Sequence, residues 1–511
     1  MSNGTHHLPV LVIGAGPTGL TAALELSRMG IDVRIVDKAA EPSTTSRALG
    51  VQARTLELLR PRGVGDEMLR LGNRAHRTAL HAGGRRIAGI EFGAMKSEYN
   101  FILMLAQSET ERLLTEQLAR QGVKVERSVE FSYLTDCSDY VEVMLTGPDG
   151  MSEAVQASYV IAADGSHSPV RKSLGLPFVG RALPTNYVLG DVHVAGDLAE
   201  DQLSIFLATN GFLAVFPMGD GRFRFMATDP DGFTGDADEP TLADIQVLYD
   251  RTVHIPGRLY DLDWSSRFRI NSRHMETLRH GRVFFGGDTA HVHSPAGGQG
   301  MNAGIQDMVN LSWKLAMVLD GTAKPELLDT YESDRLPVIR QLVGMTERAT
   351  KVFNSTSPLV HAALTRVAPI ALSRAKVQGK AAPRLGQIAA TYRGCPIAKG
   401  GGRIGELRAG DRVPDLTLAG DGNGRLYDLL DTSTLTLLVS GSILGGAKRV
   451  VEAAGPWADV IQIRGVVSPN ELLSGSAWLL VRPDGYLAAA GHANDADRLR
   501  AWLTRWLVPT T

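Results

Sequence analysis

The chain has 511 residues, of which 44% are hydrophobic and 21% are charged, and its formal net charge at pH 7 is -2. This length allows two or three domains with substantial cores, and the composition excludes a disordered or fibrous chain. The small net charge gives no electrostatic reason to expect nucleic acid or an anionic membrane as a partner. No apolar run approaches the roughly 18 residues of a membrane span, so we expect no membrane partner.

The cysteines and the first residues bear on metal binding and on location. Cys137 and Cys395 are far apart, and the histidines form neither an H-x-x-x-H pair nor a combined Cys/His set, so we predict no metal site. Two distant cysteines are compatible with a reducing compartment. The opening MSNGTHHLPVLVIGAG has no basic leader and runs directly into a glycine motif. We therefore expect no targeting peptide and a cytoplasmic location.

The first predicted unit lies in LPVLVIGAGPTGLTAALELSRMGIDVRIVDK. A buried strand at 10–13 precedes a helix that ends near Arg28, and a second strand follows at 32–36. Between the first strand and the helix stands G-x-G-x-x-G, formed by Gly14, Gly16 and Gly19. The first glycine allows a tight turn, the second lets a pyrophosphate approach the positive helix end, and the third allows close helix packing. Asp37 is placed to accept a hydrogen bond from a ribose hydroxyl, so the whole unit predicts a dinucleotide site. A glycine motif alone, without the strands and the acid, could be only a turn.

Two further segments follow in the first half of the chain. SYVIAADGSHSPVRKSLGL predicts a strand at 159–162, then Asp164-Gly165, and then a helix entered at Ser168 to Arg171. Taken alone, a capped turn explains this segment as well as a cofactor site does. From about Gly175 to Arg273, short runs with period-two patterning predict a sheet. Alternation places Phe212, Ala214 and Phe216 on one face of a strand, and Phe223 and Phe225 on one face of the next, although any of these could be core.

The segment VFFGGDTAHVHSPAGGQGMNAGIQDMVNLSWKLA decides which dinucleotide is favoured. An apolar strand meets Gly287-Asp288, and a helix begins near Gly298 to Asn302. A carboxylate at a strand end suits ribityl or ribose hydroxyls, and free N–H groups at a helix N-terminus suit a flavin pyrimidine edge that becomes anionic on reduction. This combination favours FAD over NAD. The alternative is that Asp288 only caps the helix and the glycines only form a turn.

The C-terminal part predicts a separate domain. Helical patterning between about Leu342 and Arg393 gives way to the glycine-rich connector CPIAKGGGRIGELRAGDRVPDL. Beyond Gly405, strands are predicted at TLTLLVSG, ADVIQIRGVV and SAWLLVRPDGYLAAAG, the last with a turn at Pro483-Asp484-Gly485. No cysteine lies beyond Cys395, which excludes dithiol chemistry in this domain and favours a role in packing or subunit contact.

Together the GxGxxG, DG and GD motifs resemble those of the group A flavoprotein monooxygenases, the para-hydroxybenzoate hydroxylase-like aromatic hydroxylases. SRALGVQARTLELL, QSETERLL and YESDRLPV also resemble family segments, so the resemblance covers essentially the whole chain. The chain is most similar to the three-domain polyketide and phenol hydroxylases of actinomycete type. The resemblance implies an α/β fold with a Rossmann-like FAD-binding domain over 1–75, 100–174 and 274–398, a β-sheet substrate domain over 76–99 and 175–273, and a thioredoxin-like domain without cysteines over 399–511.

Carried over by motif, the resemblance implies these cofactor-binding residues: Gly14, Gly16, Pro17, Thr18, Gly19, Asp37, Lys38, Arg47, Gln107, Asp164, Gly165, Arg171, Gly287, Asp288, Pro295, Gly298, Gly300, Met301 and Asn302. Arg112 is either a companion of these residues or part of a solvated helix face. His291 follows GGDTA, where the family often has histidine, and a hydrogen-bonded structural role is favoured over proton transfer. No acid or base stands out by spacing, so the catalytic residues stay unknown.

The activity that the resemblance implies is that of a FAD-dependent monooxygenase. NAD(P)H would reduce the flavin, dioxygen would add at flavin C4a, and the hydroperoxide oxygen would pass to a phenolic or polycyclic, polyketide- or antibiotic-like aromatic. No second glycine-rich unit exists, so the nicotinamide would bind transiently, and the family favours NADPH over NADH. An oxidase, reductase or cyclase of the same fold that inserts no oxygen, or a flavin-binding sequestration protein, is the alternative.

The middle sheet would form the substrate side, over the flavin. The substrate-binding residues expected there are Phe212, Ala214, Phe216, Phe225 and Pro295. Benzoate-type relatives place a basic residue where Ala214 and Phe216 stand, so we expect a larger apolar or polycyclic substrate. Besides the aromatic substrate and O2, no partner is expected, and the chain would be a monomer or a homodimer.

Overall fold

The computed structural model describes residues 7–44, 48–208, 211–229, 239–295, 297–418, 424–440, 447–466 and 476–510. Its first layer is a mainly parallel sheet in the order β17-β18-β11-β1-β2-β8, to which β10 and β9 are added beside β11. The bounds of these strands are β17 (Arg279–His280), β18 (Val283–Phe285), β11 (Ser152–Ala162), β1 (His7–Ile13), β2 (Val33–Asp37), β8 (Val125–Arg127), β10 (Val141–Thr146) and β9 (Glu130–Asp136).

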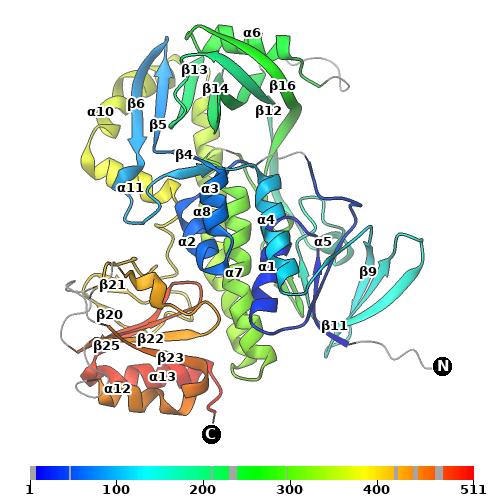
Figure 1. The fold of residues 1–511 in the computed structure, drawn as a ribbon, viewed down its shortest axis with the longest axis vertical. Helices are drawn as coiled ribbons and strands as arrows, with labels where there is room; N and C mark the ends of the chain where they lie inside the picture. Colours follow the sequence, from blue (N-terminus) through cyan, green and yellow to red (C-terminus); the bar gives the residue numbers. More distant parts are fainter. Residues whose placement is uncertain are drawn as a thin grey trace.

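The predicted strand-helix-strand unit is confirmed at the centre of this sheet. β1 pairs in parallel with β2 on one side and with β11 on the other, and α1 (Pro17–Arg28) connects β1 to β2. The side chains from Val10 to Val12 are fully buried. α4 (Gln107–Arg120) and α7 (Gly300–Leu319) pack against α1, and the three helices lie side by side in Figure 1. Gly304, in the second turn of α7, is close to Thr18 and Gly287, which follow the carboxyl ends of β1 and β18. This edge is where ligands bind in open α/β sheets.

The second layer is a sheet in the order β19-β16-β12-β15-β14-β13-β5-β6. Its strands are β19 (His291–Val292), β16 (Gly257–His274), β12 (Val179–Gly196), β15 (Arg222–Asp229), β14 (Gly211–Gly219), β13 (Gln202–Ala208), β5 (Arg77–Ala82) and β6 (Arg85–Glu91). β12 and β16 each extend over 18 residues, longer than the short strands that the sequence suggested. Their pairing is interrupted by two register shifts, the kind of irregularity that bends a pair of strands.

Helices cover both faces of this second sheet. α6 (Leu242–Thr252) packs on one face, where Ile245 and Tyr249 contribute to a buried apolar cluster. The other face meets the end of α8 (Asp329–Phe353) and the helical segment that follows it, through Phe353 and Leu364. That segment comprises α9 (Pro358–Ala362), a π-helical turn at Ala363–Val367 that contains Leu364, α10 (Ala368–Leu372) and α11 (Ala375–Leu385). In Figure 1, α10 and α11 lie beside β5 and β6.

Short elements complete the junction between the two layers. A small antiparallel sheet in the order β3-β7-β4 lies there, with α2 and α3 close by. Their bounds are β3 (Gly50–Val51), β7 (Ile102–Met104), β4 (Asn73–Ala75), α2 (Ala53–Leu59) and α3 (Gly65–Leu71), and the DG segment supplies α5 (Pro169–Ser173). No helix in the part of the chain that the structure describes combines the length and apolar character that crossing a bilayer would need.

The C-terminal domain is a mixed sheet in the order β23-β22-β24-β25. The strands predicted there are confirmed as β22 (Leu435–Ser440), β23 (Ile461–Val466), β24 (Ala477–Val481) and β25 (Leu487–His492). α12 (Lys448–Ala454) and α13 (Ala496–Trp506) lie on one face, and Trp313 from α7 enters the same apolar core. A short hairpin, β20 (Arg403–Ile404) and β21 (Leu407–Arg408), precedes the sheet.

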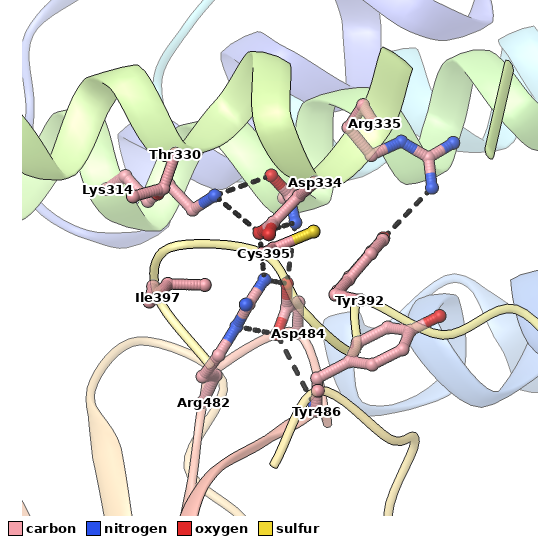
Figure 2. Close-up of polar contacts among 12 residues, drawn as sticks. Lys314, Thr330, Asp334, Arg335, Tyr392, Cys395, Ile397, Arg482, Asp484 and Tyr486 are labelled. Carbon is pink, nitrogen blue, oxygen red and sulfur yellow. Dashed lines mark hydrogen bonds and ion pairs between the residues drawn. The ribbon is translucent and has the colours of Figure 1, made fainter. Parts of the chain in front are cut away.

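A buried cluster of charges joins this domain to the rest of the chain (Figure 2). Arg482 and Asp484 stand on the turn between β24 and β25, and the Arg482 guanidinium lies 2.9 Å from the Asp334 carboxylate of α8. The Lys314 ammonium of α7 donates to Asp334 at 2.9 Å and to Asn310 at 2.8 Å. Burial acts to raise the pKa of Asp334, but Lys314 and Arg482 hold it below its usual value. The cluster therefore contains an ionised carboxylate between two cationic side chains.

Lys314 predicts a pH dependence of stability. Burial lowers the pKa of Lys314 to about 8, from 10.5 in the unfolded chain, even though Asp334 favours the charged amine. Between these two values only the unfolded chain still binds the proton, so the free energy of unfolding should rise as the pH increases from 8 to 10.5. We expect urea unfolding to show this rise in the wild type relative to Lys314→Met, because the substitution removes the titrating group. Parallel curves for the two proteins would contradict the prediction.

Candidate cofactor and substrate site

The glycine turn after β1 is shaped by close contacts. Gly14 has φ +103°, and a Cβ atom there would lie 2.2 Å from the carbonyl oxygen of Ala163. A Cβ at Gly19 would lie 1.9 Å from the carbonyl oxygen of Gly14. A Cβ at Gly16, in contrast, would meet nothing within 4 Å. Two of the glycines thus allow the chain to pack on itself, and Gly16 faces the open side where a pyrophosphate can approach the start of α1.

The carboxylate of Asp37 lies beside this turn at the end of β2. It accepts hydrogen bonds from the backbone N–H groups of Ala15 at 2.6 Å and Ala39 at 2.8 Å. Lys38 next to it is exposed to solvent. These bonds fix the carboxylate next to the glycine turn, which is the position that the ribose interpretation requires.

Three residues in or near α4 were considered as contacts of the cofactor, and the structure bears on them differently. Gln107 begins α4, and its side chain donates to Glu111 at 2.8 Å and accepts from the Ala48 N–H at 3.4 Å. Arg47 lies outside the described residues. Arg112 is exposed and pairs with Glu109 at 2.8 Å and with Glu116 at 2.6 Å on its own helix. It therefore belongs to a solvated helix face, the second of the two roles considered for it.

The DG segment is bonded to the GD segment. Asp164 accepts from the Val170 N–H at 3.1 Å and from the Thr289 hydroxyl at 3.1 Å, and the Gly165 N–H donates to the same hydroxyl at 2.9 Å. Burial raises the pKa of Asp164, although these hydrogen bonds act against it. Arg171 is buried and donates to the carbonyl oxygens of Thr289 at 2.6 Å and Ser166 at 2.8 Å. In this structure Arg171 holds the two loops together, and its predicted contact with the cofactor remains a prediction.

Asp307 organises the GD turn, Gly287–Thr289, and was not identified from the sequence. Its carboxylate accepts from the Gly287 N–H at 3.0 Å, from His291 Nε2 at 2.7 Å and from Arg335 Nε at 2.7 Å. Burial acts to raise the pKa of this carboxyl, but Arg335 and His291 hold it below its usual value. His291 is 1% exposed and bonded to Asp307, which agrees with the structural role favoured for it. The signal in the sequence that could have identified Asp307 is its charge, which interrupts the otherwise apolar run of α7.

The loop before α7 is held against β3 by amide side chains. Asn302 accepts from the Gln52 N–H at 2.8 Å and donates to the carbonyl oxygens of Gly50 at 2.7 Å and Gly298 at 2.9 Å. Gln52 in turn donates to the Gly297 carbonyl oxygen at 2.8 Å. α7 begins at Gly300 without a side-chain cap, within the range that the sequence predicted. The first N–H groups of the helix, including those of Gly300 and Met301, have no intrahelical acceptor and remain available to a ligand.

Polar atoms in this loop and in Gln52 beside it fit a heteroaromatic ligand. Within the described part of the chain, Gln52 Oε1, His293 Nε2 and Gln299 Nε2 are buried and have no hydrogen-bond partner. Burial lowers the pKa of His293 to about 4, so its imidazole is neutral near pH 7. Unsatisfied buried polar atoms are rare in folded proteins and call for a partner. Together with the open side of Gly16, they fit a ligand that has a pyrophosphate at one end and a polar ring at the other, as FAD has.

The second sheet contains most of the residues that were predicted to bind the substrate. Phe212, Ala214 and Phe216 lie on one face of β14, in an apolar cluster with Tyr187 and Met226. Phe223 and Phe225 share one face of β15, as their alternation predicted, but this is the opposite face of the sheet, where the Phe225 ring stacks on Tyr249 of α6 with ring centroids 5.7 Å apart. Phe225 therefore does not share a surface with the other three residues, and its predicted contact with the substrate stays a prediction. Period-two alternation assigns residues to a common face of one strand but does not say which face a helix covers.

Comparison with known proteins assigns the family. The family description "FAD binding domain" matches residues 7–346, and "Aromatic-ring hydroxylase, C-terminal" matches residues 406–509. The chain is 35% identical to 6-methylpretetramide 4-monooxygenase of Streptomyces rimosus over 97% of this chain and 92% of that protein.

Solved structures agree with this assignment. The anhydrotetracycline hydroxylase OxyS of Streptomyces rimosus superposes with a TM-score of 0.81 at 29% identity, over 99% of this chain and 100% of that chain. The Diels-Alderase PyrE3 of pyrroindomycin biosynthesis superposes with a TM-score of 0.78 at 26% identity, over 98% of this chain and 100% of that chain. The chain therefore belongs to the family of FAD-dependent aromatic-ring hydroxylases.

Proposed function

We propose that this FAD-dependent monooxygenase hydroxylates a large, apolar phenolic or polycyclic aromatic and takes its electrons from NADPH or NADH. The observation that carries the substrate class is the apolar face of β14, where Phe212 and Ala214 lie among Tyr187, Met226 and Phe353. A small aromatic acid would need a cationic partner for its carboxylate, whereas the Phe212 and Ala214 side chains, which are buried in this apolar cluster, offer only carbon atoms. The tetracycline-type names of two relatives support the same class.

We assign the binding of FAD to the cluster at the carboxyl ends of the central strands. The turn from Gly14 to Gly19 and the start of α1 would bind the pyrophosphate, and Asp37 would accept from a ribose hydroxyl. Asp288 is exposed on the GD turn and would face the ribityl chain. The N–H groups of Gly300 to Asn302 lie at the positive end of α7 and would stabilise negative charge on the ring edge. When bound, FAD supplies electron transfer and dioxygen activation.

The chain's own contribution to the reaction is then position and exclusion of water. Phe212, Ala214 and Phe216 would hold the substrate in an apolar surrounding in which competing hydrolysis is suppressed. Pro295 lies in the loop between this sheet and α7 and would border both ligands. His293 is neutral and its Nδ1 donates to the Ser294 carbonyl oxygen at 2.8 Å, so Nε2, which has no partner among the described residues, can accept one hydrogen bond there without bringing a charge into the site.

A cyclase that inserts no oxygen is the second candidate. It is favoured by one specific observation, the likeness to a Diels-Alderase over nearly the whole of both chains. Both activities would need the same FAD-binding residues, so the site geometry supports each equally. Oxygen incorporation is the property that separates them.

The test is a turnover assay on purified protein under oxygen-18 gas. NADPH oxidation is measured with and without a panel of polycyclic phenols of tetracycline, angucycline and rifamycin type, and the products are analysed by mass spectrometry. We expect one panel member to stimulate NADPH oxidation and to gain one labelled oxygen atom. Stimulated turnover without label would support an oxidase, reductase or cyclase, and binding without turnover would support a sequestration protein.

We also propose a cytoplasmic protein that is a monomer or a homodimer. Its two cysteines, Cys137 and Cys395, are both unpaired, which is compatible with a reducing compartment. Sedimentation equilibrium on the FAD-loaded protein would determine the number of subunits, and a tetramer or larger assembly would contradict the proposal.

A further inference from the structure

A chain of hydrogen bonds leads from the GD turn to the connection with the C-terminal domain. The Gly287 N–H donates to Asp307, and Asp307 accepts from Arg335 Nε. On its other side, the Arg335 guanidinium donates through Nη1 to the Tyr392 hydroxyl at 3.0 Å, as Figure 2 shows. Tyr392 belongs to the connector after α11, not to the FAD-binding sheet. Three successive contacts therefore join the turn that carries Asp288 to a residue outside the FAD-binding layers.

The C-terminal domain holds Tyr392 in place. The Tyr392 ring packs against the ring of Tyr486, with centroids 4.2 Å apart, and the Arg482 guanidinium lies 5.2 Å from its centre. The Tyr392 N–H donates to the Gly410 carbonyl oxygen at 2.7 Å. Tyr392 is 2% exposed, so its hydroxyl has no access to solvent as a substitute partner. Its position depends on how the turn between β24 and β25 is docked.

We propose that Tyr392 is a positioning residue through which the C-terminal domain fixes the Asp307–Arg335 pair, and with it the Gly287 turn, for FAD. This inference rests on the proposed cofactor site but not on the substrate class. Arg335 donates to three acceptors at once, through Nε to Asp307, through Nη1 to Tyr392 and through Nη2 to the Ala303 carbonyl oxygen at 3.2 Å. The Tyr392 hydroxyl is thus one of two contacts beyond Asp307 that limit the rotation of the guanidinium. The cysteine-free domain would thus contribute to cofactor binding by geometry, without chemistry of its own.

The test makes the same chemical change, Tyr to Phe, in each of the two rings that pack against each other. Tyr392→Phe removes the acceptor of Arg335 Nη1 and leaves that buried N–H unpaired, while the contacts of Nε with Asp307 and of Nη2 with Ala303 remain possible. Tyr486→Phe removes a hydroxyl that is buried and has no partner among the described residues, so it serves as the matched control. We expect the FAD dissociation constant of the apoprotein, measured by flavin fluorescence, to rise at least about fivefold for Tyr392→Phe and to stay unchanged for Tyr486→Phe.

Thermal unfolding separates positioning from a general loss of stability. A positioning role lowers the midpoint of the FAD-loaded protein more than that of the apoprotein, because the stabilisation by FAD depends on its dissociation constant. Equal losses in both forms, with an unchanged dissociation constant, would overturn the proposal. Should Tyr392→Phe fail to fold, Arg335→Lys keeps a cation beside Asp307 and removes the bond to Tyr392. FAD binding as tight as in the wild type for Arg335→Lys would equally overturn it.

A further variant distinguishes failure of this inference from failure of the cofactor site. Gly16→Ala tests the proposed pyrophosphate position directly and does not touch Tyr392. If Gly16→Ala weakens FAD binding while Tyr392→Phe does not, the cofactor site holds and the coupling through Tyr392 is wrong. If neither variant affects FAD binding, the proposed cofactor site itself is wrong.

Discussion

Gly14→Ala is expected to lower the free energy of unfolding of the apoprotein and to abolish or weaken the binding of FAD. The residue has φ +103°, a conformation that L side chains rarely adopt, and its new Cβ would lie 2.2 Å from the Ala163 carbonyl oxygen. Backbone strain and overpacking together should lower the free energy of unfolding of the apoprotein by about 3 kcal/mol or more. Urea unfolding of the apoprotein and the flavin absorbance of the purified protein measure the two losses. A variant with wild-type stability would show that β1 and β11 can separate at this turn without cost.

Gly16→Ala is the matched control for this change. The same methyl group is added two residues away, but it meets nothing within 4 Å. We therefore expect the apoprotein to unfold within about 0.5 kcal/mol of the wild type. FAD binding should nevertheless weaken at least about tenfold, because the methyl group occupies the space through which the pyrophosphate approaches the backbone. Wild-type affinity in Gly16→Ala would contradict the proposed position of the pyrophosphate.

Asp334→Ala is expected to have the second large effect. The substitution removes the carboxylate shared by Lys314 and Arg482, whose side chains are 0% and 1% exposed. Asp484 still pairs with Arg482, but among the described residues Lys314 keeps only the side-chain amide oxygen of Asn310 as an acceptor. Removing one partner of a buried ion pair costs about 3 to 5 kcal/mol, because the remaining charge is left without compensation. Urea unfolding, together with limited proteolysis between the two parts of the chain, measures this loss.

The control for Asp334→Ala is a variant that removes the carboxylate from an ion pair on the surface of the protein. Glu109→Ala removes a partner of Arg112, which is 43% exposed and also pairs with Glu116. Its expected effect is below about 1 kcal/mol, because water screens exposed pairs. A loss of similar size in both variants would mean that the buried cluster does not hold the C-terminal domain to α7 and α8.

The sequence by itself determined the local elements and the cofactor class. The strand, glycine turn and helix from Val10 to Arg28 lie in one short stretch, and so do the GD turn and the start of α7 at Gly300. Such elements depend on the spacing of apolar residues and on glycines with positive φ, which are local properties. The same is true of the C-terminal strands, whose apolar runs and turn at Gly485 were predicted at their observed positions.

Only the tertiary structure decided how distant residues complete the site. The partners of Asp307 include Arg335, and Arg335 meets Tyr392, 57 residues further along the chain. Arg482 reaches Asp334 across an even longer separation, and Phe225 faces α6 instead of sharing a surface with Phe212. No local spacing encodes these contacts, because they depend on which faces of α7, α8 and the two sheets are packed together. Propensity and periodicity describe one element at a time, whereas buried ion pairs and shared faces arise only when the elements dock.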